Sequence, residues 1–358
     1  MPTCGMSSGP AGSFHAQRRA IPEQPHAPRR RRRAAAAALL AIFAVTVGDA
    51  AARDERAAEA APAVPAAMAT RLKALDCARV GPDDVSEVLS HVPAPRIVLL
   101  QGSVTFVSME PFARFLIGMG YPAERLRNPR DGRYTYSSFA DSAALAGALA
   151  FDYEQSGLEP MLIGHSQGGM LALRVLYEFA GEFHDALPVV DPATGAALPR
   201  TTIVDPLTHR ARPVVGLHVA YAAALATGWL PRVLLGQWSM LPLLRRVPDT
   251  VTEFTGFDVP NDPIAGNLLG IEPYVALGSA RVRNVLLPAG YRHIDLPRAD
   301  HLADDPAARR WIDAWQPGAE QPLPDGDMRN IVHAADIWHS VRHHWCIQAQ
   351  RLLTLSSS

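Results

Sequence analysis

The chain has almost no lysine. Lys73 is the only one among 358 residues, and arginine supplies every other basic side chain. We interpret this bias as a property of coding rather than a sign of nucleic-acid binding, because the arginines after residue 53 are scattered and form no basic stripe. The sequence therefore predicts no nucleic-acid partner.

Only one apolar run indicates a targeting segment, and it lies near the N-terminus. Five consecutive arginines, Arg29 to Arg33, precede small and apolar residues from Ala34 to Val47. This run is too short for an ordinary membrane span of about 20 residues, and a small-x-small cleavage site follows it. Residues 1–52 are therefore predicted to be a signal peptide, with an uncleaved N-terminal anchor as the alternative. We expect export to the periplasm or the medium.

Cysteine is scarce, with three residues in the whole chain. Cleavage after residue 52 would leave two of them, Cys77 and Cys346, and a net charge of about −6, which gives no preference for a polyanion. In an oxidising compartment this pair favours a disulfide between the two ends of the mature chain, with two buried thiols as the alternative. Residues 53–69 are rich in Ala, Glu and Pro and predict a flexible linker, so folding is expected to begin near Thr70.

Glycine-rich phosphate loops and dinucleotide fingerprints are absent, so the sequence implies no cofactor. In the C-terminal stretch, His339 and His343 have a spacing that can bind zinc. Because the pattern lacks a convincing third ligand, we interpret residues 326–358 as an amphipathic helical extension that packs its tryptophans on the domain. No metal site is predicted.

The chain does contain an alternation of apolar runs and helical segments. Residues 97–100 and 160–163 are continuous apolar runs, typical of parallel strands buried on both faces. Helices are expected over about 110–119 and 139–155. This order predicts an α/β domain over residues 70–325, with a mostly parallel central sheet and helices on both faces.

Two further features refine this expectation. Ser138 and Asp141 have the spacing of a capping box at the start of the second helix. Residues 182–247 look like an insertion that is interrupted by a core strand near 217–221. The apolar segment 222–247 is expected to be helical and to act as a lid or acyl-binding wall, with ordinary core packing as the alternative.

A Gly-x-Ser-x-Gly pentapeptide follows the second apolar run and precedes a helical pattern, and it reads Gly164-His165-Ser166-Gln167-Gly168. A strand-to-helix context is what a nucleophile elbow requires. The outer glycines are expected because a Cβ there would collide with the neighbouring strand or helix. Ser166 is the candidate nucleophile, and His165 is expected to pack beside it.

A serine nucleophile needs a histidine base and an acid that orients the imidazole. In this architecture the chain order is Ser, acid, His. Asp262, in an Asn-Asp-Pro-Ile loop after a strand-like segment, is the candidate acid, with Asp258 as the alternative. His293 follows the apolar run 282–288 and is the candidate base, with His301 as the alternative.

An oxyanion also needs main-chain donors. The N–H of Gln167 lies at a helix start, where donors are unpaired and the helix dipole favours negative charge. The second donor is expected in the loop that follows Leu100, and Ser103 is the candidate there.

Over about residues 95–315 the chain resembles the α/β-hydrolase superfamily, in its lipase and esterase branch. The resemblance is carried by residues 164–169, by Gln101-Gly102-Ser103 and by the Asp-then-His order. It implies the α/β-hydrolase fold with an inserted cap, and a Ser-His-Asp site for acyl transfer. Gln101 departs from the His-Gly pair that usually opens the oxyanion loop.

These features predict an exported serine hydrolase that cleaves a carboxylic ester of a small molecule or a lipid, with contact to a membrane surface in the lipid case. The apolar segment 222–247 motivates the lipid preference. An acyltransferase with the same triad is one alternative. A catalytically silent scaffold that acts as a binding protein is the other, and neither substrate nor oligomeric state follows from a fold.

Overall fold

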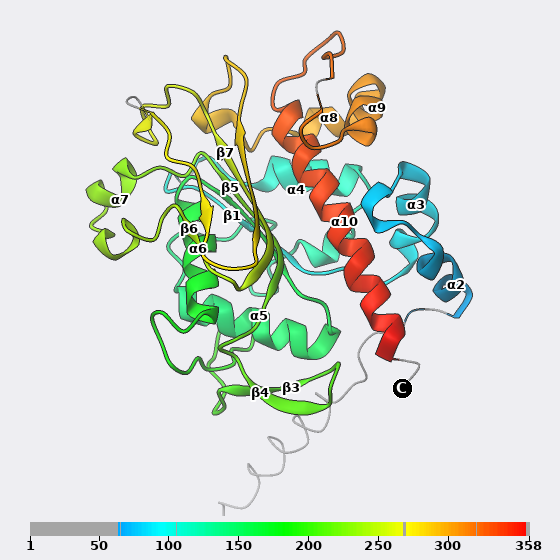
Figure 1. Ribbon diagram of the computed structural model, residues 1–358, viewed down its shortest axis with the longest axis vertical. Coiled ribbons are helices and arrows are strands. Elements are labelled where there is room, and N and C mark those ends of the chain that lie inside the picture. Colours follow the sequence, from blue (N-terminus) through cyan, green and yellow to red (C-terminus); the bar gives the residue numbers. More distant parts are fainter. Residues whose placement is uncertain (1–63, 65, 105, 268–269, 320, 356–358) are drawn as a thin grey trace, which may run out of the picture. The chain divides into compact units, whose positions relative to one another are not determined.

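A five-stranded parallel sheet forms the centre of the protein (Figure 1). The computed structural model describes residues 64, 66–104, 106–267, 270–319 and 321–355. In spatial order the strands are β1 (Ile97–Leu100), β2 (Met161–His165), β5 (Val219–Leu225), β7 (Val251–Asp258) and β9 (Arg281–Leu286). The predicted α/β class with a mostly parallel sheet is confirmed.

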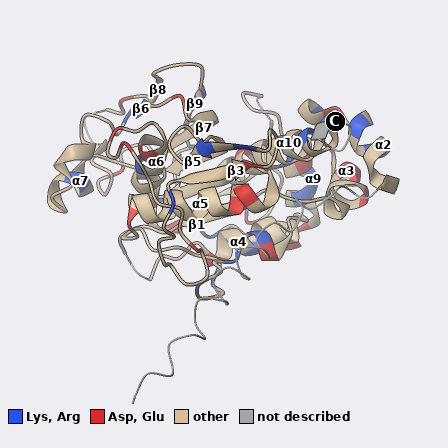
Figure 2. Cartoon of the chain, turned by 90° about the horizontal axis from the view of Figure 1, so that it is seen from below, with Lys and Arg blue, Asp and Glu red and all other residues tan. Residues whose placement is uncertain are grey.

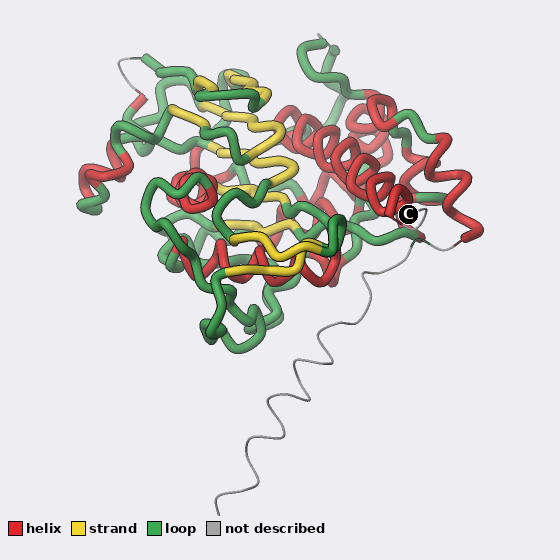
Figure 3. The backbone as a smooth tube through the Cα atoms, turned by 60° about the horizontal axis from the view of Figure 1, so that its bottom comes forward, coloured by secondary structure: helices red, strands yellow, loops and turns green. Residues whose placement is uncertain are grey.

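Helices cover both faces of the sheet, so each face has its own apolar core. In β1, Ile97 and Leu99 belong to one core, while Val98 and Leu100 belong to the other, because successive side chains of a strand point to opposite faces. The first core is completed by α4 (Glu110–Gly118), α8 (Asp300–Asp304), α9 (Pro306–Ala314) and α10 (Ile331–Leu355). The second is completed by α5 (Ser142–Ser156) and α6 (Gln167–Phe179), and Figure 3 shows helices on either side of the strands.

All five strands run in the same direction, so their carboxyl ends meet at one edge of the sheet. The loops after β1, β2, β5, β7 and β9 therefore converge there. This is the edge at which open α/β sheets bind ligands.

Smaller elements surround this framework. Two short strand pairs lie outside the sheet, the hairpin of β3 (Thr202–Asp205) with β4 (Arg210–Pro213), and β6 (Arg246–Val247) with β8 (Val275–Ala276). The remaining helical pieces are α2 (Ala66–Ala74), η1 (Cys77–Arg79), α3 (Pro82–Glu87), η2 (Leu89–His91), η3 (Ala123–Arg125), α7 (Leu230–Leu234), η4 (Trp238–Met240) and η6 (His293–Asp295). Acidic and basic residues are interspersed over these elements (Figure 2).

The structure differs from several sequence-based expectations. Helix α2 begins at Ala66, so the folded part starts before Thr70, and the predicted signal peptide and residues 53–63 lie outside the described residues. Helix α5 begins at Ser142 and is capped by Asp141, whose Oδ1 accepts from Ala144 N at 2.8 Å, whereas the hydroxyl of Ser138 donates to Gly102 O. Segment 222–247 is also less helical than expected, since its first residues complete β5.

The C-terminal stretch is part of the core. Trp338 and Trp345 of α10 are almost completely buried in the apolar core on one face of the sheet. The stretch is helical and packs its tryptophans on the domain, as the sequence predicted. Within the described part of the chain, no helix combines the length and apolar character needed to cross a membrane.

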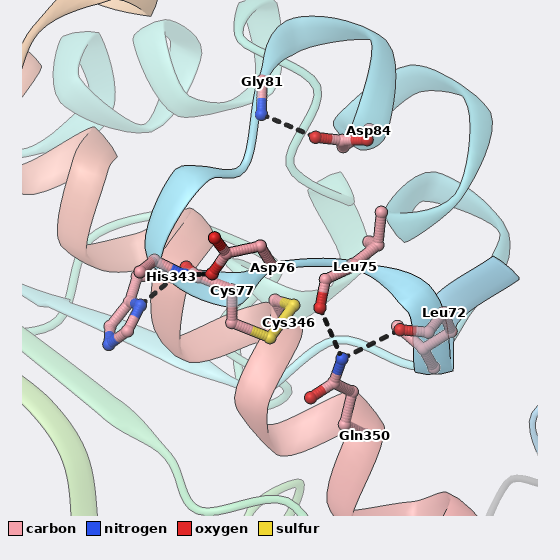
Figure 4. The surroundings of a disulfide bond; sticks show 10 residues. Leu72, Leu75, Asp76, Cys77, Gly81, Asp84, His343, Cys346 and Gln350 are labelled. Carbon is pink, nitrogen blue, oxygen red and sulfur yellow. Dashed lines mark hydrogen bonds between the residues drawn. A yellow bond between two sulfur atoms is a disulfide. The ribbon is translucent and has the colours of Figure 1, made fainter.

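A disulfide between Cys77 and Cys346 joins η1 to α10, as predicted (Figure 4). Its Cα atoms are 5.4 Å apart. One turn before Cys346, His343 Nδ1 donates to Cys77 O at 2.7 Å, and one turn after it Gln350 Nε2 donates to the main-chain oxygens of Leu72 and Leu75. These bonds fix the first described elements against the last helix.

Candidate active site

Ser166 lies at the turn between β2 and α6 and has a strained backbone. Its φ is 53° and its ψ is −114°, a conformation that costs a residue with a side chain about 1–3 kcal/mol. The neighbouring strand holds it there: Ser166 N donates to Leu225 O at 2.7 Å, and Thr227 Oγ1 donates to Ser166 O at 2.9 Å. Strain that the surroundings maintain in this way is typical of a functional residue.

The outer glycines of the pentapeptide are needed for space, as predicted. A Cβ added to Gly168 would lie 2.1 Å from Leu100 O, and one added to Gly164 would lie 2.3 Å from the carbonyl carbon of Gly168. Both contacts involve main-chain atoms, which cannot move aside as a flexible side chain could. A side chain at Gly168 would push α6 away from β1, and one at Gly164 would push α6 away from β2.

Asp262 and His293 form a buried pair. His293 Nδ1 donates to Asp262 Oδ2 at 2.7 Å, and Asp262 Oδ1 accepts from the main-chain N–H groups of Ile264 and Ala265. Burial alone would raise the pKa of Asp262, but these hydrogen bonds outweigh it and hold the pKa below its usual value. The carboxylate therefore stays ionised, and the bond to Nδ1 leaves Nε2 of the neutral imidazole as an acceptor.

The two alternatives lie in other surroundings. Asp258 forms a buried ion pair with Arg245, at 3.0 and 3.2 Å between the paired atoms. Burial raises the pKa of Asp258 even with this partner beside it. His301 lies in α8, with its Nε2 3.9 Å from Asp327 Oδ1. The structure thus brings Asp262 together with His293, and neither Asp258 nor His301 takes part.

His165 links the candidate nucleophile to the candidate base. Its Nε2 donates to the main-chain oxygen of His293 at 2.8 Å, and the two rings are 5.0 Å apart. Burial lowers the pKa of His165 to about 3, so the ring is neutral near physiological pH. Within the described residues, Ser166 Oγ makes no hydrogen bond to the ring of His293. A contact between a nucleophile and a base is often long or poorly aligned when no substrate is bound. The sequence suggested only packing for His165, because a contact 128 residues away leaves no local signal.

The loop after β1 packs directly on the elbow. A Cβ added to Gly102 would lie 3.3 Å from Ser166 Cβ and 3.1 Å from His165 Nδ1. The hydroxyl of Ser138 donates to Gly102 O at 3.1 Å and so fixes this loop from the other side. Ser103 follows in the same loop and is half-buried, while Gln167 is the first residue of α6.

One group of residues away from this edge has metal-ligand chemistry. Atoms of Glu253, His343 and His344 that could bind a metal lie within 4.8 Å of one another. Arg281 and Arg283 already contact the carboxylate of Glu253, at 3.1 and 3.2 Å. Two guanidinium groups so close disfavour a divalent cation, and we interpret the group as an ion-pair network.

No protein-family model and no curated protein matches this sequence. The function of the site has to be inferred from its own geometry and chemistry.

Proposed function

We propose that this protein is a serine hydrolase of the α/β-hydrolase type, which cleaves carboxylic esters through an acyl-enzyme on Ser166. The observation that supports this most is the strained serine at the end of β2 beside the buried Asp262–His293 pair. A strained serine alone could be structural. A buried histidine whose Nδ1 is fixed by a carboxylate has the form of a general base.

The chemistry would proceed in two halves. His293 Nε2 takes the proton of Ser166 Oγ as the oxygen attacks the ester carbonyl, and Asp262 stabilises the imidazolium that forms. The tetrahedral intermediate collapses and His293 returns the proton to the leaving alcohol. A water molecule then attacks the acyl-enzyme with His293 again as the base.

The oxyanion would be held by main-chain donors. In this proposal the N–H of Gln167, at the start of α6, is one donor and the N–H of Ser103 is the other. The close packing of Gly102 on Ser166 supports this assignment, because it brings the loop after β1 next to the reacting serine.

Exposed apolar side chains point to an ester with an apolar part. Phe106, Trp229, Ile264 and Ile294 are all exposed, and they lie on the loops after β1, β5, β7 and β9. These loops share the edge that carries Ser166, so in this proposal their apolar side chains are available to an apolar part of the ester. We assign the segment from Trp229 to Met240 as the cap over this edge.

The disulfide supports an exported protein, because such bonds persist in oxidising compartments. Export itself rests on the predicted signal peptide. Fusion of residues 1–52 to a reporter that is active only outside the cytoplasm would test it, with the five-arginine run changed to alanine as the control.

A fluorophosphonate probe tests the central proposal, because it reacts covalently with activated serines. We expect the purified protein to form one adduct and Ser166→Ala to form none. Ser86→Ala, at an exposed position on α3, is the matched control and should label like the wild type. Lack of labelling in a folded wild-type sample would contradict the proposal and favour a silent scaffold.

A further inference from the structure

A groove of about 290 Å³ runs along the elbow helix away from Ser166. Its floor is one stripe of α6, formed by Gln167, Met170, Leu171 and Arg174, which have the spacing of one helix face. Residues 138–142 form one wall, and Gln237, between α7 and η4, also lines it. The groove therefore lies between the elbow helix and the segment we assign as the cap.

The near end of the groove begins at Gln167, one residue after Ser166. Gln167 Nε2 donates to Ser138 O at 3.4 Å. The hydroxyl of the same Ser138 donates to Gly102 O. Ser138 thus joins the groove wall to the loop that packs on Ser166, so the groove begins beside the proposed site.

Polar atoms in this groove lack protein partners. Gln167 is completely buried, yet its Oε1 accepts no hydrogen bond, and the buried Nε of Arg174 donates none. Within the described ranges no carboxylate pairs with Arg174, whose guanidinium lies 4.9 Å from the centre of the Phe183 ring. Buried polar groups without a partner are unfavourable, so a polar occupant of the groove would be stabilised.

The charge of the groove points to an anion at its far end. Asp141 also lines the wall, but it is exposed and its Oδ1 caps α5, so solvent screens its effect. Arg174 lies seven residues beyond Gln167, a rise of about 10 Å along an α-helix. Its fork of donors suits a carboxylate or a phosphate.

We propose that this groove binds one arm of the ester, and that this arm carries a carboxylate or phosphate about 10 Å from the ester carbonyl. Gln167 Oε1 accepts a hydrogen bond from the near part of the arm, and Arg174 binds the anionic end. The other arm lies against the exposed apolar side chains of the edge. This inference rests on the proposed hydrolase function and names its substrate class.

Paired esters test it. In one pair the charge is on the acyl arm: the anionic member is the mono-p-nitrophenyl ester of suberic acid, and the neutral member is the same ester with its free carboxylate methylated. The other pair is the butyrate ester of 8-hydroxyoctanoate and the butyrate ester of its methyl ester, in which the charge is on the alcohol arm. The readout is the ratio of kcat/KM for the anionic ester to that for its neutral partner.

In one of the two pairs we expect a ratio of at least about ten for the wild type, as for a hydrogen-bonded charge pair. The ratio should fall towards one in Arg174→Gln and with increasing salt, and Arg174→Lys should restore part of it. Arg310→Gln, at an exposed position on α9, removes the same charge elsewhere and should leave the ratio unchanged.

Different results would overturn different claims. A ratio near one in both pairs for an enzyme that hydrolyses the neutral esters would refute the groove assignment alone. A preference that survives Arg174→Gln would also refute it. If neither the esters nor the fluorophosphonate probe reacts with folded wild type, the hydrolase function fails and the groove assignment fails with it.

Discussion

Replacing Asp262 with asparagine isolates the charge of the candidate acid. The amide keeps the shape of the side chain and an oxygen that can accept from His293 Nδ1, so the loop should remain folded. It removes the negative charge that would stabilise an imidazolium 2.7 Å away. The expected result is an intact protein with a much slower reaction at Ser166.

The size of the effect follows from the burial of the pair. The side chains of His293 and Asp262 are 6% and 1% exposed, so solvent screens their interaction little. For charge centres about 4 Å apart and an effective dielectric constant of about 20, the attraction is about 4 kcal/mol. Losing it when the imidazolium forms would slow the reaction by about 1000-fold.

The assay is the second-order rate of labelling by the fluorophosphonate probe, with thermal unfolding measured in parallel. Asp258→Asn is the matched control. It should lower stability because it leaves Arg245 buried without its carboxylate, while labelling of the folded fraction changes little. The reasoning fails if Asp262→Asn labels at more than about a tenth of the wild-type rate, or if Asp258→Asn labels as slowly while folded.

Three further predictions concern stability. Changing Cys77 and Cys346 to serine should lower the free energy of unfolding by up to about 5 kcal/mol, since the disulfide closes a loop of 269 residues. Chemical denaturation measures this loss. Wild type with its disulfide reduced should lose the same free energy, which serves as the internal check. Gly168→Ala should prevent correct folding of the elbow. Gly132→Ala, where φ is 73° but the space is open, should lower the free energy of unfolding by about 1 kcal/mol. Equal shifts of the thermal unfolding temperature in the two variants would contradict the steric argument. Burial would raise the pKa of Glu253, but hydrogen bonds and ion pairs outweigh it and hold the pKa below its ordinary value of 4.5. The ionised carboxylate therefore stabilises the fold above pH 4.5, and this stabilisation is lost as the pH falls through the lowered pKa. In Glu253→Gln the free energy of unfolding should depend less on pH in that acid range, as measured by denaturation at a series of pH values. A pH dependence equal to that of the wild type would argue against the ion-pair network.

Most of the sheet could be predicted because buried parallel strands are continuous apolar runs. The run at 97–100 matches β1 to the residue, and the run at 160–163 covers the first three residues of β2. The elbow was visible because its glycines are required by close main-chain contacts, which leave a local pattern. The catalytic roles of Ser166, Asp262 and His293 stay predictions.

What the sequence could not decide depends on contacts between distant segments. Asp258 ends β7 and Asp262 follows four residues later, and only the position of Arg245 shows which carboxylate is already paired. Ser138 and Asp141 are both good helix caps, and only the structure shows that Asp141 caps α5 while the Ser138 hydroxyl donates to Gly102 O. The link from His165 to the main chain of His293 and the unpaired groups of the groove are equally invisible without coordinates.

The bond between Cys77 and Cys346 turns the chain between them into a covalent ring that includes every strand of the sheet and all the candidate catalytic residues. A protease that cuts this ring once opens it but releases no fragment. A molecule nicked in the stretch between α9 and α10 should therefore migrate as a single species on a non-reducing gel and as two pieces after reduction. Both new ends would stay tethered to the same body, so a single nick need not separate Ser166 from His293.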